Sequence, residues 1–191
     1  MSKHLIIFII AGVLSGCNKY QRECHIQPYY ELSSSVKQWF PYSGNKDLIF
    51  LDADLREDTL QLKNFFLGDD EVWNGDECAI SKGQFLRGNI VDVKSNDTIR
   101  TEIGYAERIS IERKSTWIIY YDTRRSVSQP NTFRRFEAAI TLNGHVYNNV
   151  LATECSLTDN CIVTGITKYY FSKGRGLVGF ERGSKVWTLK E

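Results

Sequence analysis

Carboxylates gather in two short stretches of the sequence, and carboxylate oxygens are ligands that calcium prefers. The first stretch is Asp52-Ala53-Asp54, which is followed by Glu57 and Asp58. A calcium-binding EF-hand loop that began at Asp52 would need glycine in place of Glu57 and glutamate in place of Lys63, so this motif is absent. The sequence instead predicts an acidic turn that faces solvent.

The second acidic stretch comprises Asp69-Asp70-Glu71 and Asp76-Glu77, and it could take a divalent ion with poor specificity. Hydrolytic motifs are missing, because the chain contains neither G-x-S-x-G nor H-E-x-x-H. Paired carboxylates such as Glu102 and Glu107 could do glycosidase chemistry, but their separation cannot be read from the sequence. We expect a non-catalytic protein without metal or cofactor, and the alternative is a hydrolase of glycan or peptide that uses the two acidic stretches.

Basic residues form the third group with possible chemistry. Arg124, Arg125, Arg134 and Arg135 flank one loop and could form a patch for anionic lipid or glycan phosphate, although hairpin ends that face solvent are the simpler interpretation. The run Lys173-Gly174-Arg175-Gly176 lacks the phosphate-loop pattern and predicts a turn. Because the formal net charge is +1, no overall field attracts nucleic acid, and we expect no such partner.

The first seventeen residues have the organisation of a signal peptide. Lys3 supplies a positive charge, Leu5 to Val13 is an almost unbroken apolar run, and Leu14-Ser15-Gly16-Cys17 ends on a cysteine. This stretch resembles the lipobox of bacterial lipoproteins, which implies removal of residues 1–16 and acylation of Cys17, for example with palmitate. The apolar run is shorter than the roughly 20 residues of a membrane-spanning helix, so the anchor would be lipid. An uncleaved helix or a plain secretory signal is the alternative.

The resemblance also implies a location. In enterobacterial lipoproteins, aspartate after the lipidated cysteine resembles a signal for retention in the inner membrane, and this chain has Asn18 there. The run Asn18-Lys19-Tyr20-Gln21-Arg22-Glu23 also lacks the acidic cluster of surface-exported lipoproteins. We therefore expect an outer-membrane anchor with the protein on the periplasmic face. The expected partners are the membrane and either an apolar ligand or an envelope protein.

Four cysteines remain after the lipobox, namely Cys24, Cys78, Cys155 and Cys161. An oxidising compartment favours disulfides, and four cysteines allow three pairings. The turn composition between Cys155 and Cys161 favours that pair, which leaves Cys24 with Cys78. Reduced thiols are the alternative, and zinc spacing is absent because no C-x-x-C occurs.

Hydropathy along the rest of the chain follows the period of β-strands. Asn143-Gly144 predicts a two-residue hairpin turn, and the apolar run Trp117-Ile118-Ile119-Tyr120-Tyr121 indicates a strand that is buried on both faces or lies at the centre of the sheet. A loop is expected over Gly68–Asp76. The expected strands are Leu48–Leu51, Thr59–Leu67, Phe85–Val93, Ile99–Arg113, Ser115–Tyr121, Phe136–Leu142, His145–Thr153, Ile162–Ser172, Leu177–Arg182 and Val186–Leu189.

Two regions resemble small uncharacterised lipoproteins of Bacteroidota. They are Trp39-Phe40-Pro41-Tyr42 and the run from Lys168 to Glu181, which contains Tyr169-Tyr170 and Gly176-Leu177-Val178 and precedes Trp187. The likeness covers the signal, the Trp39 region and roughly the last forty residues. It implies a family of envelope lipoproteins and no particular chemistry.

These patterns predict a mainly antiparallel β protein, either a curved half-barrel-like sheet or a β-sandwich. Residues 1–16 would be the signal peptide, 17–35 a lipidated cysteine with a polar tether, and 36–191 one β domain with a short helix over Val36–Phe40 that ends before Pro41. Trp39, Trp73 and Trp117 could line a concavity for an apolar ligand or fill a core. The expected function is non-catalytic binding or assembly at the outer membrane, and a subunit of an envelope complex is a further alternative.

Overall fold

The computed structural model describes residues 25–74, 79–104, 108–113, 116–122, 134–154 and 165–191. Within them, twelve strands form a single sheet, and the one helix, α2 (Ser34–Lys37), is a single turn. No helix among these residues has the length and apolar character to cross a membrane. The strands are β1 (His25–Ile26), β2 (Gly44–Leu51), β3 (Glu57–Asn74), β4 (Ala79–Asp92), β5 (Asp97–Gly104), β6 (Arg108–Arg113), β7 (Thr116–Asp122), β8 (Arg134–Leu142), β9 (His145–Glu154), β10 (Ile166–Ser172), β11 (Gly176–Arg182) and β12 (Lys185–Leu189).

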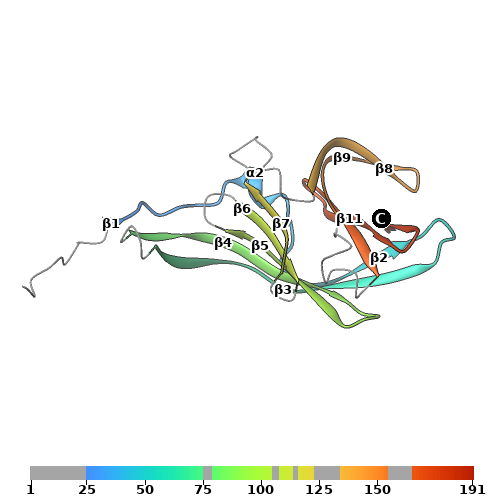
Figure 1. Cartoon of the computed structure of the whole chain (residues 1–191), viewed down its shortest axis with the longest axis horizontal. Helices are drawn as coiled ribbons and strands as arrows, with labels where there is room; N and C mark the ends of the chain where they lie inside the picture. Colours follow the sequence, from blue (N-terminus) through green and yellow to red (C-terminus); the bar gives the residue numbers. More distant parts are fainter. Residues whose placement is uncertain (1–24, 75–78, 105–107, 114–115, 123–133, 155–164) are drawn as a thin grey trace, which may run out of the picture.

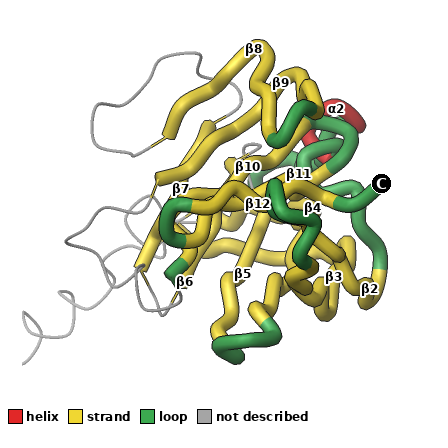
Figure 2. The backbone as a smooth tube through the Cα atoms, turned by 90° about the vertical axis from the view of Figure 1, so that its right-hand side faces the viewer, coloured by secondary structure: helices red, strands yellow, loops and turns green. Residues whose placement is uncertain are grey.

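The sheet consists of two antiparallel meanders that meet at one seam. Strands β2 to β7 are neighbours in chain order, and so are β8 to β12. At the seam β12 pairs with β2, with Thr188 opposite Leu51 and Leu189 opposite Phe50. The sheet curls into a half-barrel (Figure 2). This confirms the predicted half-barrel, and it excludes the sandwich for the described strands because they all belong to one sheet.

The hairpin between β8 and β9 confirms the predicted turn. Asn143 and Gly144 both have positive φ, 45° and 85°, which a type I′ turn requires. The tip of this hairpin reaches the seam, where the Asn143 side chain donates hydrogen bonds to the carbonyls of Leu51 and Val186. Leu142 packs where a Cβ on Gly179 would lie, so a glycine is needed there for the hairpin to close on β11. This contact belongs to a second, smaller core of Leu142, Tyr147, Val150, Ala152, Tyr170 and Val178.

Three of the predicted elements are wrong. β3 continues to Asn74 and pairs with β4 throughout, so Gly68–Asn74 is strand rather than loop. The single strand expected over Ile99–Arg113 is two antiparallel strands, β5 and β6. β7, expected at the centre of the sheet, lies at the end of its strand order. Hydropathy reports what covers the faces of a strand and does not report which of its edges are paired, so it could not place β7.

The segment before α2 is attached to the sheet, and we call residues 25–33 the strap. His25 and Ile26 pair in parallel with Ala79 and Ile80 of β4, and the Tyr30 N–H donates to the Lys82 carbonyl at 2.8 Å. Within the polar tether expected over residues 17–35, residues 25–30 are therefore attached to the edge of the sheet.

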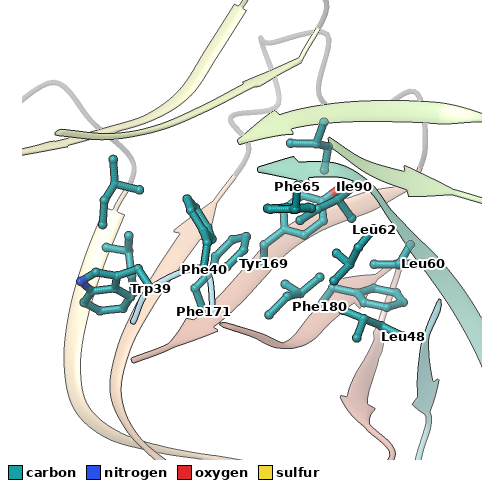
Figure 3. Close-up of a cluster of buried hydrophobic side chains, with 14 of the residues drawn as sticks. Trp39, Phe40, Leu48, Leu60, Leu62, Phe65, Ile90, Tyr169, Phe171 and Phe180 are labelled. Carbon is teal, nitrogen blue, oxygen red and sulfur yellow. The ribbon is translucent and has the colours of Figure 1, made fainter. Parts of the chain in front are cut away.

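After the strap, the chain enters the concave side of the sheet and fills it. The Ser33 hydroxyl caps α2 by accepting from the Val36 N–H, and the helix ends at Lys37, three residues before the predicted end at Phe40. Leu32, Val36, Trp39 and Phe40 are all buried in the main core, and the Phe40 ring lies 5.5 Å from that of Phe171, edge to face (Figure 3). Trp39 is thus a core residue.

Candidate functional site

A group of ion-paired side chains lies at one end of the concave face. Period-two alternation puts Asp58 on the same face of β3 as the core residue Leu60, and Arg182 on the same face of β11 as Phe180. Arg182 bridges two carboxylates, with Nη1 2.5 Å from Asp58 Oδ2 and Nη2 2.7 Å from Asp92 Oδ2. The side chains of Asp58, Asp92 and Arg182 are 0%, 5% and 18% exposed. We call these three residues the buried triad.

Turn residues add hydrogen bonds to the two carboxylates of the triad, whereas the buried Arg182 Nε has no hydrogen-bond partner. Lys94 Nζ lies 3.1 Å from Asp58 Oδ1, and the backbone N–H of Lys94 and the Ser95 hydroxyl donate to Asp92. The Arg182 guanidinium also lies over the Phe180 ring, 5.3 Å from its centroid. The triad thus joins β3, β4 and β11 at the end of the apolar core. The positive charges of Arg182 and Lys94 balance the negative charges of the two carboxylates.

Asp52 lies beside the triad and organises the turn between β2 and β3. Its Oδ1 accepts from the backbone N–H groups of Asp54 and Arg56, both at 2.9 Å, and its Oδ2 accepts from Lys185 Nζ at 2.8 Å. The hydrogen bond from Lys185 lowers the pKa of Asp52 although burial opposes the shift, and the same bond raises the pKa of Lys185. The expectation of a solvated acidic turn is therefore wrong for Asp52, which is buried.

The first three residues of the second acidic stretch, Asp69, Asp70 and Glu71, lie on β3, and their side chains contact residues of β4 and the strap. Glu71 pairs with Lys82 at 2.5 Å, and Asp70 lies 3.6 Å from Arg87. Asp69 accepts a hydrogen bond from the Tyr29 hydroxyl, which raises the pKa of Tyr29 because an ionised phenol could not donate. Asp76 and Glu77 lie outside the described residues. In the part of the chain that the structure describes, no three or more His, Cys, Asp or Glu side chains are grouped to hold a metal ion.

Glu102 is held by two arginines. Arg87 Nε lies 2.7 Å from its Oε2, and Arg100 Nη2 lies 3.1 Å from the same oxygen. Its proposed partner Glu107 is outside the described residues. Beside Glu102 is a cavity of about 40 Å³, lined by Asp70, Ser81, Gly83, Gln84, Phe85, Glu102 and Gly104. This volume holds a water molecule or two and not a sugar.

Several predicted positions lie outside the part of the chain that the structure describes. Arg134 and Arg135 begin β8 opposite Thr153 and Ala152, but their side chains, like those of Trp73 and Trp117, are outside the described part. The same holds for Arg124, Arg125 and all five cysteines: Cys17, Cys24, Cys78, Cys155 and Cys161. The predicted turn over Lys173–Gly176 is present, with positive φ at Gly174 and Gly176.

Arg182 is the site residue that motif reasoning missed. Its signal was available in retrospect, since it follows Phe180 by two positions in a predicted strand and so shares the core-facing side. Nothing in the local sequence, however, identifies Asp58 and Asp92 as its partners.

Fold and site together define a half-barrel β protein with a filled concavity and a buried ion-paired cluster at one end. No protein-family model, curated protein or solved structure matches the chain.

Proposed function

We propose that this chain is a lipoprotein of the bacterial cell envelope, anchored by lipid at Cys17, that serves binding or assembly at the outer membrane without catalysis. The observation that carries the proposal is the apolar run Leu5 to Val13 followed by Leu14-Ser15-Gly16-Cys17. Two or more acyl chains give durable attachment, whereas a single chain gives only marginal attachment.

The pairing of the described carboxylates supports a non-catalytic role. A general acid or base must come within hydrogen-bond reach of its substrate. Asp52, Asp58 and Asp92 are buried and each is bonded to a cation, and Glu102 is held by two arginines. An envelope hydrolase using the acids near Asp52 would have to break these pairs, which makes it the weaker alternative.

The filled concavity favours a protein partner over an apolar ligand. Fully burying one large apolar side chain stabilises by roughly 1.5–3 kcal/mol, so displacing Leu32, Val36, Trp39 and Phe40 together would cost roughly 6–12 kcal/mol. A ligand that occupied this space would have to supply that free energy. Assembly through the outer surface, as the accessory subunit of an envelope complex, needs no such displacement.

The anchor is tested by metabolic labelling with palmitate. Label should be incorporated by the wild-type chain and lost in Cys17→Ala, and the matched variant Cys24→Ala should keep it. Undiminished label in Cys17→Ala would refute lipidation at this residue.

The mode of binding is tested by crosslinking in membranes. If the chain is an assembly subunit, pull-down should recover one partner protein in stoichiometric amount. If it is an apolar carrier instead, lipid mass spectrometry of the extracted protein should find one bound lipid class, and no stoichiometric partner should appear.

The proposed envelope location also favours disulfides. The turn composition between Cys155 and Cys161 favours that pair and leaves Cys24 with Cys78. A non-reducing peptide map should then link Cys24 to Cys78; a map that joins Cys24 to Cys155 or Cys161 would contradict this pairing.

A further inference from the structure

One end of the sheet is a narrow projection of three strands. β5 accompanies β4 only as far as the pair Leu86 and Ile103. Beyond that pair the strap takes the edge of β4, from Tyr30 opposite Gly83 to His25 opposite Ala79. We call this projection the arm: residues 67–74 of β3, residues 79–86 of β4, and the strap.

The arm and the turn between β2 and β3 lie at opposite ends of the long axis of the molecule (Figure 1). β3 runs from one to the other over 18 residues. At about 3.3 Å per residue this separates its two ends by roughly 55 Å. Leu55, in the distal turn, is 75% exposed.

The strap is fixed to the arm by specific contacts. Gln27 N–H donates to the Ile80 carbonyl at 2.9 Å, and Gln84 N–H donates to the Tyr30 carbonyl at 2.8 Å. The Tyr30 carbonyl lies 2.7 Å from where a Cβ on Gly83 would be, so the strap approaches β4 closely because that residue is glycine. The chain is therefore held to the sheet from His25, at the outer end of the arm.

This attachment limits how far the protein can be from its lipid. Seven residues lie between Cys17 and His25, and the eight Cα-to-Cα steps from one to the other span at most about 29 Å when fully extended. Resting on the proposed lipidation of Cys17, we propose that the arm is the membrane-facing end of the protein, opposite the phospholipid headgroups, and that the β2–β3 turn is the end directed away from the bilayer.

One physical reason directs the distal end outward. The bilayer excludes the protein from half of the space around the anchor, so a long body tethered at one extreme has more orientations with its other end away from the surface. Charge does not contribute to this orientation, because exposed Asp69, Asp70 and Glu71 lie beside the single basic residue Lys82 within the described side chains of the arm and make it unsuited to adhesion on anionic lipid. The tether, and not attraction of charge, keeps the arm close.

The orientation is tested by energy transfer on the full-length lipidated protein in phosphatidylcholine vesicles that carry an acceptor dye on the lipid headgroup. A fluorescent amino acid replaces either Lys82 in the arm or Leu55 in the distal turn, so the native cysteines stay unlabelled. We expect transfer from position 82 to be at least about twofold more efficient than from position 55, given the separation of roughly 55 Å.

A tether variant provides the matched control. An insertion of about forty glycine and serine residues before His25 raises the root-mean-square tether length to roughly 38 Å and should lower transfer from position 82 toward that of position 55. Equal transfer from the two positions in the native-length chain would overturn the orientation while leaving the anchor intact. A chain that fails to float with the vesicles would refute the anchor itself, and the orientation with it.

Discussion

Replacing Arg182 by methionine should strongly destabilise the protein, because this residue is the shared partner of two buried carboxylates. Arg182→Met keeps the unbranched apolar stem that packs near Phe180 and removes the guanidinium. Asp58, with a fully buried side chain, and Asp92, 5% exposed, then lose their closest cationic contacts, at 2.5 and 2.7 Å.

The expected magnitude follows from the remaining contacts. Breaking a buried ion pair by removing one partner typically costs about 3–5 kcal/mol. In the variant, Lys94 still lies 3.1 Å from Asp58, and Ser95 still donates to Asp92. We therefore expect the free energy of unfolding to fall by the lower end of this range, about 3 kcal/mol. For a chain of this size that loss lowers Tm by roughly 6–12 °C.

The assay is urea and thermal unfolding of the full chain, followed by tryptophan fluorescence and circular dichroism. Lys190→Met is the control: Lys190 and its partner Glu57 are 47% and 54% exposed, and such surface pairs contribute about 0–1 kcal/mol. Adding Asp58→Asn and Asp92→Asn to Arg182→Met should recover part of the loss, because neutral amides carry no uncompensated charge. A loss below about 1 kcal/mol for Arg182→Met alone would refute the buried triad as a stabilising unit.

Two further substitutions probe the charged turn and the main core. Lys185→Met removes the hydrogen bond that lowers the pKa of Asp52, a stabilisation that is present above the ordinary carboxyl pKa of about 3.9 and lost as pH falls below it. The urea midpoint of Lys185→Met should therefore lie below wild type at pH 7 and converge with it as pH falls through the lowered pKa of Asp52, whereas a difference that persists in strong acid would contradict the linkage. Gly88→Ala places a Cβ 2.3 Å from the Phe65 ring and should cost about 1–3 kcal/mol by overpacking, measured by urea unfolding. Gly104→Ala, where the nearest atom is a flexible Glu102 oxygen at 3.3 Å, should cost far less, and equal losses would argue against overpacking.

The sequence predicted most strands and the C-terminal meander because turn chemistry and period-two hydropathy are local signals. Asn143-Gly144 specified its hairpin through the positive φ that both positions adopt. The continuation of β3 through Gly68–Asp70 had no local signal. A strand in the narrow arm has little core to face, so its residues are polar and lack the apolar alternation that predicts a strand. The end of β5 at Gly104 likewise gave little local signal, because the sequence there has a single glycine and its apolar pattern continues without interruption.

The strap and α2 were underestimated for a different reason. Leu32, Val36, Trp39 and Phe40 are spaced by four, three and one residues, a pattern typical of one helical face, and they lie in a stretch otherwise rich in serine and other polar residues. The polar composition of this stretch therefore suggested a tether, whereas the spacing of its four apolar residues indicated a segment that faces the core. The buried triad was beyond local reasoning altogether, since Arg182 and Asp58 are 124 residues apart in the chain.

The seam between β2 and β12 has a consequence for how each copy of the protein matures. Strand β2 can complete its pairing only after residues 185–189 have been synthesised, so the first meander waits with an open edge. Pairings this distant in sequence make folding slow, and an unpaired strand edge is where another chain can add. Until β12 closes the seam, β2 is therefore an edge at which a newly synthesised copy can aggregate, and a chaperone that shielded β2 would protect the chain during this interval.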